Sequence, residues 1–253
     1  MDLIDRAEQA PFTGWDFGYL RGRWVQGAPP WDYLALARAR CAHVTSLLDL
    51  GTGGGEKLAS LRDALPARVH ATEAYAPNVE VARQRLQPLG VQVTAITDLY
   101  PVPDQDRAYH LPFPDGSFDL VLSRHEAYDP SEVARVLTVG GHFLTEQVGG
   151  GHYAELNAAL GAPAPPFSSW RLGAARAHAE AAGLRVTLAN KATTQTTFCD
   201  VGAVVYYLRA VPWQVPGFTV ARYRPALDRL HRPHVANSHP FLMEAVKPCP
   251  ERA

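Results

Sequence analysis

A cluster of glycines follows the first strongly apolar run of the chain. The run Val44–Leu50 (VTSLLDL) ends in the segment Asp49-Leu50-Gly51-Thr52-Gly53-Gly54-Gly55, and helix-like sequence begins at about Glu56. Glycines at a strand-to-helix junction let the backbone turn sharply and approach a ligand without a Cβ atom in the way. In open α/β sheets, ligands bind at this edge, beyond the carboxyl ends of the strands. The segment therefore predicts a ligand-binding loop.

The spacing of these glycines discriminates between classes of ligand. A dinucleotide fingerprint, G-x-G-x-x-G counted from Gly51, needs glycine where this chain has Glu56. A carboxylate at that position would oppose a pyrophosphate at the helix N-terminus. The Lys-Ser/Thr ending of a phosphate-binding P-loop is also absent. An NAD-linked oxidoreductase and a nucleoside triphosphate site are therefore disfavoured, and the pattern that fits is D-x-G-x-G-x-G, with Asp49, Gly51, Gly53 and Gly55.

An acidic residue lies where a second ligand contact is expected. Glu73 is in the apolar run Val69–Ala74 and comes 22 residues after Gly51. A carboxylate at the end of a second strand can accept both hydroxyls of a ribose, as an acid at similar spacing does in dinucleotide folds. The alternatives are that Asp49 is an ordinary strand-end cap and that Glu73 is a solvated acid. Their occurrence together, at matching strand ends, favours cofactor binding.

An alternation of strand and helix patterns over residues 44–150 indicates the parallel α/β sheet that positions these groups. Strands are expected at Val44–Leu50, Val69–Ala74, Val91–Thr97, Phe118–Leu122 and His142–Val148. Helices are expected over Glu56–Ala64, from Pro77 to Gly90, and from the N-cap Asp129 to the Gly140-Gly141 break. Beyond Gly151 we expect a helix to about Ala182, strands at LRVTLAN and TTQTTFC, and a helix over Gly202–Val211.

Composition excludes several classes of protein. The 253 residues are 47% hydrophobic, and 24 Lys and Arg are balanced by 25 Asp and Glu, so a broad polyanion-binding face is disfavoured. No apolar run reaches the roughly 18 residues of a membrane span, and the N-terminus does not resemble a secretory signal. The three cysteines are far apart, and His231, His234 and His239 lack metal-site spacing. We expect a cytoplasmic protein without a metal site.

The chain resembles the class I S-adenosylmethionine-dependent methyltransferases, specifically the type-11 methyltransferase family. Four blocks carry the resemblance in the family's order: LLDLGTGGGE, ATEAYAPN, LPFPDGSFDLVLSRHEAY and EVARVLTVGGHFLTEQ. Together they span roughly residues 44–148. The resemblance implies a doubly wound, mostly parallel sheet of seven strands with the last strand antiparallel, and S-adenosyl-L-methionine as the cofactor.

The resemblance also implies roles for individual residues. Asp49 orders the loop and helps to hold the cationic methionyl end of the cofactor, and Glu73 binds the ribose. Ala74 and Tyr75 border the adenine. The acid–Ala pair that contacts the adenine edge in the family is interrupted here, because one residue separates Asp106 from Ala108, although Ala108 keeps its spacing to Leu111. Ser123 and Arg124 line the floor beneath the sulfonium.

Catalytic candidates follow from the chemistry of methyl transfer. Because the sulfonium is an excellent leaving group, proximity and orientation supply much of the acceleration and a general base is optional. His125 is the leading candidate for a base, since it follows the fourth strand, and Glu126 is the second. Tyr206 and Tyr207 are candidates for orienting a nucleophile in an aromatic acceptor wall. The alternatives are a packed loop histidine and core aromatics on a helix.

The predicted organisation is a single methyltransferase domain over residues 1–253. Residues 1–40 form an aromatic-rich N-terminal lid, residues 44–150 the cofactor-binding core, and residues 151–253 the C-terminal half of the sheet with acceptor-side helices. The lid is inferred from aromatic residues whose faces suit a sulfonium cation: Trp15, Tyr19, Trp24, Trp31 and Tyr33. Hydrophobic anchoring of an N-terminal helix pair is the alternative. The role of residues 222–253 stays open.

The function predicted is methyl transfer to an O or N atom of a small-molecule acceptor. An RNA or protein methyltransferase is the first alternative, disfavoured because the chain has only three lysines, although Arg171, Arg176, Arg222 and Arg224 leave a locally basic groove open. A non-catalytic S-adenosylmethionine-binding protein is the second, because a fold does not establish catalysis and no acceptor-binding motif is recognisable.

Overall fold

The computed structural model describes residues 1–12, 15, 17–96, 110–164, 167–230 and 233–249. The chain divides into two compact units. The large-sheet unit comprises Trp31–Gln147, Leu172–Asn190 and Phe241–Ala253, and the small-sheet unit comprises Met1–Pro30, Val148–Arg171 and Lys191–Pro240. The predicted organisation as a single domain, with parts at residues 1–40, 44–150 and 151–253, stays a prediction.

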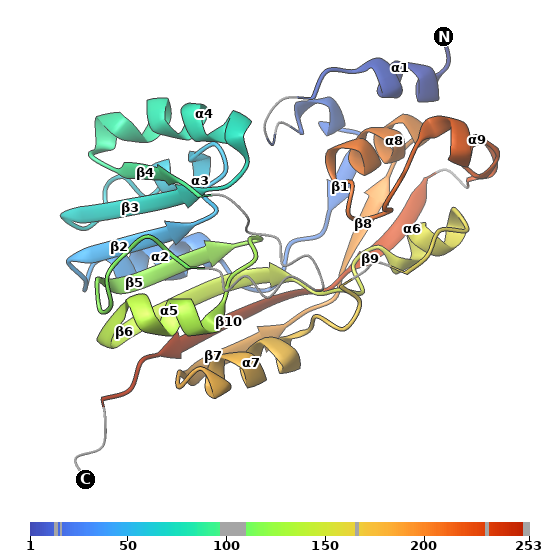
Figure 1. The fold of residues 1–253 in the computed structure, drawn as a ribbon. Helices are drawn as coiled ribbons and strands as arrows, with labels where there is room; N and C mark the ends of the chain where they lie inside the picture. Colours follow the sequence, from blue (N-terminus) through green and yellow to red (C-terminus); the bar gives the residue numbers. More distant parts are fainter. Residues whose placement is uncertain (13–14, 16, 97–109, 165–166, 231–232, 250–253) are drawn as a thin grey trace. The chain divides into compact units, whose positions relative to one another are not determined.

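The large-sheet unit is built on seven strands in the order β4-β3-β2-β5-β6-β10-β7 (Figure 1). The strands are β2 (Ser46–Leu50), β3 (Arg68–Glu73), β4 (Gln92–Ala95), β5 (Phe118–Arg124), β6 (Leu137–Val148), β7 (Arg185–Lys191) and β10 (Pro240–Val246). Strand β2 pairs in parallel with β3 and β5, and so do β3 with β4 and β5 with β6. The expected seven-stranded, mostly parallel sheet is confirmed.

The direction of β10 follows from its backbone hydrogen bonds. Lys247, which comes directly after β10, accepts from the N–H of Gly140 at 2.8 Å and donates to the carbonyl of Gly141 at 3.0 Å. Gly140 and Gly141 lie near the start of β6, so the end of β10 meets the start of its neighbour. Strand β10 is therefore antiparallel to β6.

Helices of the large-sheet unit connect these strands. They are α2 (Tyr33–Cys41), α3 (Glu56–Ala59), α4 (Ala76–Leu86), the 3₁₀ turn η2 (Gln87–Leu89), α5 (Pro130–Val136) and α7 (Leu172–Ala181). Two carry side-chain N-caps, since Asp32 accepts from the N–H of Ala35 at 3.0 Å and Asp129 from that of Ser131 at 2.8 Å. The cap at Asp129 is the helix start that the sequence predicts.

Two predicted helix ends are wrong. The helix expected over Glu56–Ala64 has only the four residues Glu56–Ala59, and turns follow it. The helix from Asp129 was expected to reach Gly140-Gly141 but ends at Val136, and β6 begins at Leu137. Leu137 pairs with Phe118 and the register then shifts by a bulge, so that Leu120 pairs with His142. Strand pairing with β5 therefore competes with the helix for these residues.

The small-sheet unit has a three-stranded antiparallel sheet in the order β1-β8-β9. Its strands are β1 (Trp24–Gln26), β8 (Thr194–Phe198) and β9 (His234–Ser238), and its helices are α1 (Leu3–Gln9), η1 (Gly18–Leu20), α6 (Ala154–Ala159), α8 (Val201–Ala210) and α9 (Val220–Arg229). The strand expected at TTQTTFC is therefore not part of the large sheet. Helix α8 is the helix predicted over Gly202–Val211. In the described part of the chain, no helix is long and apolar enough to cross a membrane.

Candidate functional site

The glycine loop after β2 has a backbone that only glycine adopts readily. Gly51, Gly53 and Gly55 have φ values of +62°, +62° and +81°. A Cβ atom on Gly51 would lie 2.2 Å from Cγ of Glu126, so the loop and the Glu126 side chain are in close contact there. The loop is tied to β3 because the N–H of Thr52 donates to the carbonyl of Thr72 at 2.9 Å.

Glu73 ends β3 and contacts the glycine loop directly. Its side chain accepts from the N–H of Gly53 at 2.6 Å and from the N–H of Tyr75 at 2.8 Å, and the residue is only 4% exposed. Burial raises the pKa of Glu73, although these backbone hydrogen bonds oppose the shift. Each carboxylate oxygen has two lone pairs, so both oxygens retain the capacity to accept from a ligand hydroxyl.

Two further carboxyl groups lie at the same edge of the sheet. Burial raises the pKa of Asp49 to about 7, with a further contribution from the charge of Glu73 and opposition from the Thr52 hydroxyl. Burial also raises the pKa of Glu126 to about 7, and the charge of Glu73 again adds to the shift. Carboxylates that repel one another and accept few hydrogen bonds are stabilised by a cation beside them. This edge is therefore suited to a positively charged ligand.

Of the predicted residues, Ser123 and Arg124 end β5, and His125 and Glu126 begin the loop that follows it, which β6 holds in place. The N–H of His125 donates to the carbonyl of Glu146 at 2.9 Å. The side-chain amide of Gln147 donates to the carbonyl of Glu126 at 2.9 Å. His125 has a φ of +58°, an uncommon conformation for a residue with a Cβ atom, and such positions cluster at functional sites.

Glu146, at the end of β6, is a buried carboxylate with three neighbours. Oε2 accepts from Nε1 of Trp31 at 2.7 Å, and Oε1 accepts from Nε of Arg124 at 2.8 Å. Nε2 of His125 lies 3.5 Å from Oε1. Although burial opposes it, the His125 ring and the charge of Arg124 lower the pKa of Glu146 to about 2. Arg124, predicted beneath the sulfonium, is thus ion-paired to a residue that the sequence analysis did not single out.

Glu146, Gln147 and Trp31 are the site residues that sequence reasoning missed. The signal for the first two was present, because they end the predicted fifth strand and parallel strands bring their carboxyl ends to one edge. Trp31 was identified only as part of an aromatic group, and its hydrogen bond to Glu146 joins segments 115 residues apart.

The predicted tyrosines belong to the small-sheet unit. Tyr206 and Tyr207 lie on α8 and are 2% and 3% exposed. The hydroxyl of Tyr206 donates to the carbonyl of Pro11 at 3.2 Å, and that of Tyr207 lies 3.1 Å from Nε2 of His152. Tyr19 stacks on Tyr206 with ring centroids 4.5 Å apart. These contacts favour the alternative of core aromatics for both tyrosines, and their catalytic role stays a prediction.

Aromatic residues of the predicted lid divide between the two units. Trp24 packs in the small-sheet unit, its ring centroid 5.8 Å from that of Tyr207, so hydrophobic anchoring accounts for it. Trp31 and Tyr33 belong to the large-sheet unit. The lid itself stays a prediction. Ala108 and Asp106, expected at the adenine edge, lie outside the described residues.

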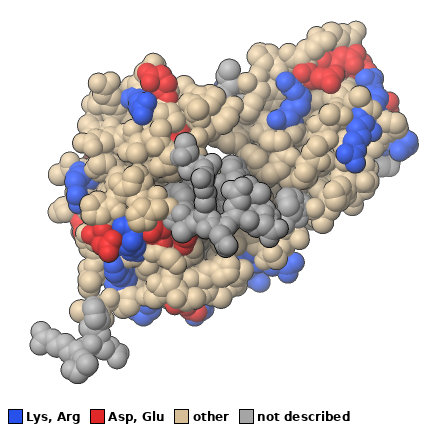
Figure 2. Space-filling view, in the orientation of Figure 1, with Lys and Arg blue, Asp and Glu red and all other residues tan. Residues whose placement is uncertain are grey.

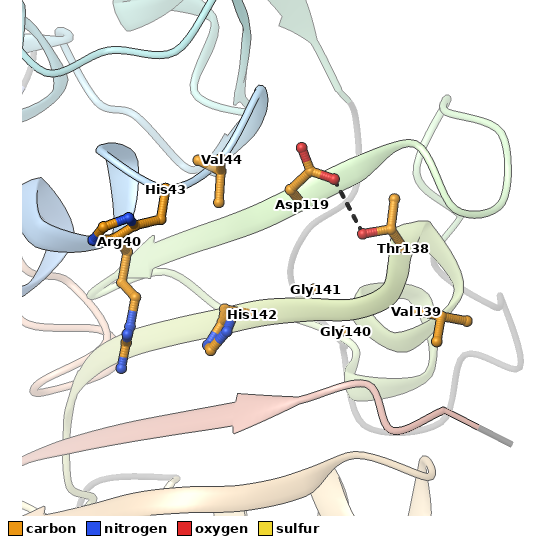
Figure 3. A pocket seen from close by; sticks show the side chains of 9 residues that line it. All are labelled: Arg40, His43, Val44, Asp119, Thr138, Val139, Gly140, Gly141 and His142. Carbon is orange, nitrogen blue, oxygen red and sulfur yellow. Dashed lines mark hydrogen bonds between the residues drawn. The ribbon is translucent and has the colours of Figure 1, made fainter. Parts of the chain in front are cut away.

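The amino edge of the large sheet contains a cavity of about 260 Å³ (Figure 3). Its lining includes Arg40, His43, Asp119, Thr138 and His142, from α2 and the turn after it, the start of β5 and the first half of β6. Because the glycine loop and Glu73 follow the carboxyl ends of their strands, this cavity is at the opposite edge of the sheet and is not part of the candidate site.

The strand order and the site together define a class of protein. A seven-stranded mixed sheet, a glycine loop after the first strand of its core and an acid ending the next strand are the features of the class I methyltransferase fold. Residues 48–145 match a family model described as a methyltransferase domain. Over these residues the chain is therefore similar to a methyltransferase domain.

Proteins similar to this chain are found both in sequence and in structure. Uncharacterized methyltransferase YcgJ of Bacillus subtilis (strain 168) is 32% identical over 128 residues, which are 48% of this chain and 46% of that protein. The chain thus spans about half the length of the curated relative that it matches. Among solved structures, a Bacillus halodurans C-125 protein is similar with a TM-score of 0.61, 18% identity, and coverage of 85% of this chain and 97% of that one. The [4+2]-cyclase SpnF is similar with a TM-score of 0.52, 16% identity, and coverage of 88% and 87%.

Proposed function

We propose that this protein is an S-adenosyl-L-methionine-dependent methyltransferase that methylates an O or N atom of a small molecule. The observation that supports it most is the convergence of the glycine loop with Asp49, Glu73 and Glu126 at the carboxyl edge of the sheet. The cofactor has a ribose with two hydroxyls and cationic groups at its methionyl end. The donor set fits it, since Glu73 can accept from the hydroxyls and the other carboxylates favour cations.

The chain's own groups contribute mainly orientation. When bound, S-adenosylmethionine supplies an electrophilic methyl group on a sulfonium that is an excellent leaving group. The glycines allow a close approach of the backbone, and Glu73 fixes the ribose end. Ser123 lies at the carboxyl end of β5, where it is predicted to form the floor beneath the methyl. Holding the two reactants in a near-attack geometry supplies much of the acceleration.

A nucleic-acid acceptor is disfavoured by the distribution of charge. A polyanion-binding face needs clustered Lys and Arg side chains. Of the arginines considered for a basic groove, Arg176 pairs with Glu180 at 2.8 Å, and Arg224 pairs with Asp2 and Asp5. In the view of Figure 2, basic and acidic side chains are mixed on the drawn face of each unit.

The second candidate is a protein with the same fold that binds S-adenosylmethionine without transferring its methyl group, either as a binding protein or as an enzyme of another reaction. The likeness to SpnF, named as a [4+2]-cyclase, supports it, because that protein shares the fold and is named for ring formation. The two candidates predict the same cofactor affinity but differ in whether the methyl group leaves it.

The test is an incubation of the purified protein with methyl-labelled S-adenosylmethionine and separate pools of potential acceptors. The pools are small hydroxyl compounds, small amines, transfer RNA and a mixture of unmodified proteins. We expect label in a small-molecule pool together with stoichiometric S-adenosylhomocysteine. Label in the RNA or protein pool would replace the small-molecule proposal, and cofactor binding without transfer to any pool would favour the second candidate.

A further inference from the structure

We propose that Glu146 is a positioning residue for His125. The Glu146 carboxylate holds the His125 ring so that Nε2 faces the carboxylate and Nδ1 is available to take a proton from the methyl acceptor. This inference rests on the proposed function. It concerns only residues of the large-sheet unit: Trp31, Arg124, His125 and Glu146. It implies that the acceptor is a group with a proton to lose, a hydroxyl or a protonated amine, rather than a thioether.

The carboxylate of Glu146 is fixed by two donors of the protein itself. Trp31 donates to one of its oxygens at 2.7 Å and Arg124 to the other at 2.8 Å, so the carboxylate plane is set from two sides. Glu146 is 5% exposed, and a charge-assisted pair in such a place is held more firmly than one in solvent. A carboxylate held in this way can orient a third group without moving itself.

His125 is held against this carboxylate by its backbone and its ring. Its N–H donates to the carbonyl of Glu146 at 2.9 Å, and its φ of +58° directs the chain out of the strand. Nε2 lies 3.5 Å from Oε1 of Glu146, a separation at the outer limit of a hydrogen bond. Such contacts are often long without substrate and tighten in the reactive complex. Among the described residues, none is hydrogen-bonded to Nδ1.

Burial favours the neutral form of the His125 ring. Crowding by protein atoms lowers the pKa of His125, Glu146 opposes this, and Arg124 and Lys57 lower the pKa further. The His125 side chain is 41% exposed, so solvent moderates each of these effects. A neutral imidazole with its proton on Nε2 carries a lone pair on Nδ1, which is the form that a general base needs.

The proton balance of the step is complete with these groups. The acceptor's proton moves to Nδ1 of His125. An oxygen lone pair of a hydroxyl acceptor, or the pair that a protonated amine regains when its proton leaves, forms the new bond to the methyl carbon. The electron pair of the broken carbon–sulfur bond stays on sulfur. The resulting imidazolium is stabilised by the Glu146 carboxylate, and solvent removes the proton afterwards.

The test is nitrogen-15 NMR of the histidine rings in the full-length protein, in wild type, Glu146→Gln and Glu244→Gln. Glu244 is the matched control, because it is also a 5% exposed carboxylate that binds an arginine, Arg40, and a histidine, His142, whose Nδ1 lies 3.0 Å away. His125→Gln assigns the resonance. The wild-type measurement requires no variant of Glu146 to fold.

We expect wild-type His125 to carry its proton on Nε2. In Glu146→Gln its titration midpoint falls by roughly one pH unit, because the carboxylate partner is lost, whereas Glu244→Gln leaves the midpoint of His125 unchanged. A proton on Nδ1 in the wild type, or an unchanged midpoint in Glu146→Gln, would overturn the inference. A calorimetric titration of the same wild-type sample with S-adenosylmethionine separates the two claims. If S-adenosylmethionine does not bind but the histidine spectra are as expected, the proposed function is rejected. The positioning of His125 by Glu146 is then still supported.

Discussion

Two edges of the large sheet carry buried or half-buried carboxylates in opposite environments. At the amino edge, Asp119 accepts from the backbone N–H groups and hydroxyls of Thr45 and Ser46, at 2.8 to 3.1 Å, and from the Thr138 hydroxyl at 3.2 Å. Although burial opposes it, these donors lower the pKa of Asp119 to about 2. At the carboxyl edge, the pKa values of Asp49 and Glu126 are raised to about 7.

The difference indicates which carboxylates receive enough hydrogen bonds from the protein's own donors. Asp119 joins the starts of three chain segments and needs nothing further, which is the behaviour of a structural group. Asp49, Glu73 and Glu126 lie close enough to repel one another and receive fewer donors, which is the behaviour of groups that await a ligand. Substitutions at the amino edge should therefore change stability, and substitutions at the carboxyl edge should change ligand binding.

The largest effect is expected from Glu73→Ala. If Glu73 binds the ribose as proposed, the substitution removes two charge-assisted hydrogen bonds, so S-adenosylmethionine binding should weaken by about 2–4 kcal/mol, roughly 30- to 1,000-fold. Calorimetric titration of variant and wild type measures the change. Binding of the variant as tight as that of wild type would remove Glu73 from the cofactor site.

The converse effect is expected from Asp119→Ala. Its loss leaves several donors of Thr45 and Ser46 without an acceptor, so the free energy of unfolding should fall by about 1–3 kcal/mol. The cofactor affinity of the folded fraction should be unchanged, because the residue is at the other edge. Urea denaturation followed by circular dichroism measures the first quantity. A matching loss of affinity would show that the two edges are not independent.

The pH dependence of binding should follow the carboxyl edge. Since the pKa values of Asp49 and Glu126 are about 7, their ionised fraction increases between pH 6 and 8. A cationic ligand prefers the ionised forms, so S-adenosylmethionine affinity should increase up to about tenfold per group per pH unit, with release of protons. Titrations in buffers of different ionisation enthalpy count these protons. An affinity that falls with pH would contradict the assignment.

Stability should depend on pH with opposite signs at the two edges. Asp49 and Glu126 have folded-state pKa values above their ordinary ones, so the stability they contribute is present below about pH 4 and is lost as the pH rises through 7. Asp119 has a lowered pKa, so its contribution is present above about pH 4 and is lost as the pH falls through 2. Asp49→Asn should therefore flatten the profile between pH 4 and 7 in a series of denaturation curves, while Asp119→Asn should flatten it below pH 4.

The smallest effect on binding is expected from His125→Ala. His125 is assigned to the acceptor side, so the affinity for S-adenosylmethionine should stay within about twofold of wild type, a difference of roughly 0.4 kcal/mol. The Glu73 variant titrated in parallel shows that a real loss would be detected. A large loss of affinity here would move His125 to the cofactor side.

Sequence patterns were sufficient to predict the position of a residue that lies at a strand end. The glycine loop, Glu73 and the loop after β5 could be predicted because parallel strands bring their carboxyl ends to one edge. The start of α5 was predictable because the Asp129 cap is a local signal. Its end was not, because the pairing of Leu137 with Phe118 is a tertiary contact that overrides local preference.

Long-range contacts account for the rest of what the sequence did not reveal. The hydrogen bond from Trp31 to Glu146 joins distant segments, and no pattern in either segment specifies it. The same holds for the second sheet, in which β8 pairs with β1 and β9, strands that lie far from it in the sequence. Tyr206 and Tyr207 looked suited to a pocket, but their burial on α8 depends on packing partners such as Tyr19 and Trp24.

The central claim is that the carboxyl edge of this sheet binds S-adenosylmethionine. Calorimetric titration of the purified wild-type protein with S-adenosylmethionine, S-adenosylhomocysteine and NAD, in parallel, tests it most directly. We expect both adenosyl sulfur compounds to bind and NAD not to bind. Binding of NAD alone, or of none of the three, would contradict it and would assign the glycine loop to a structural role.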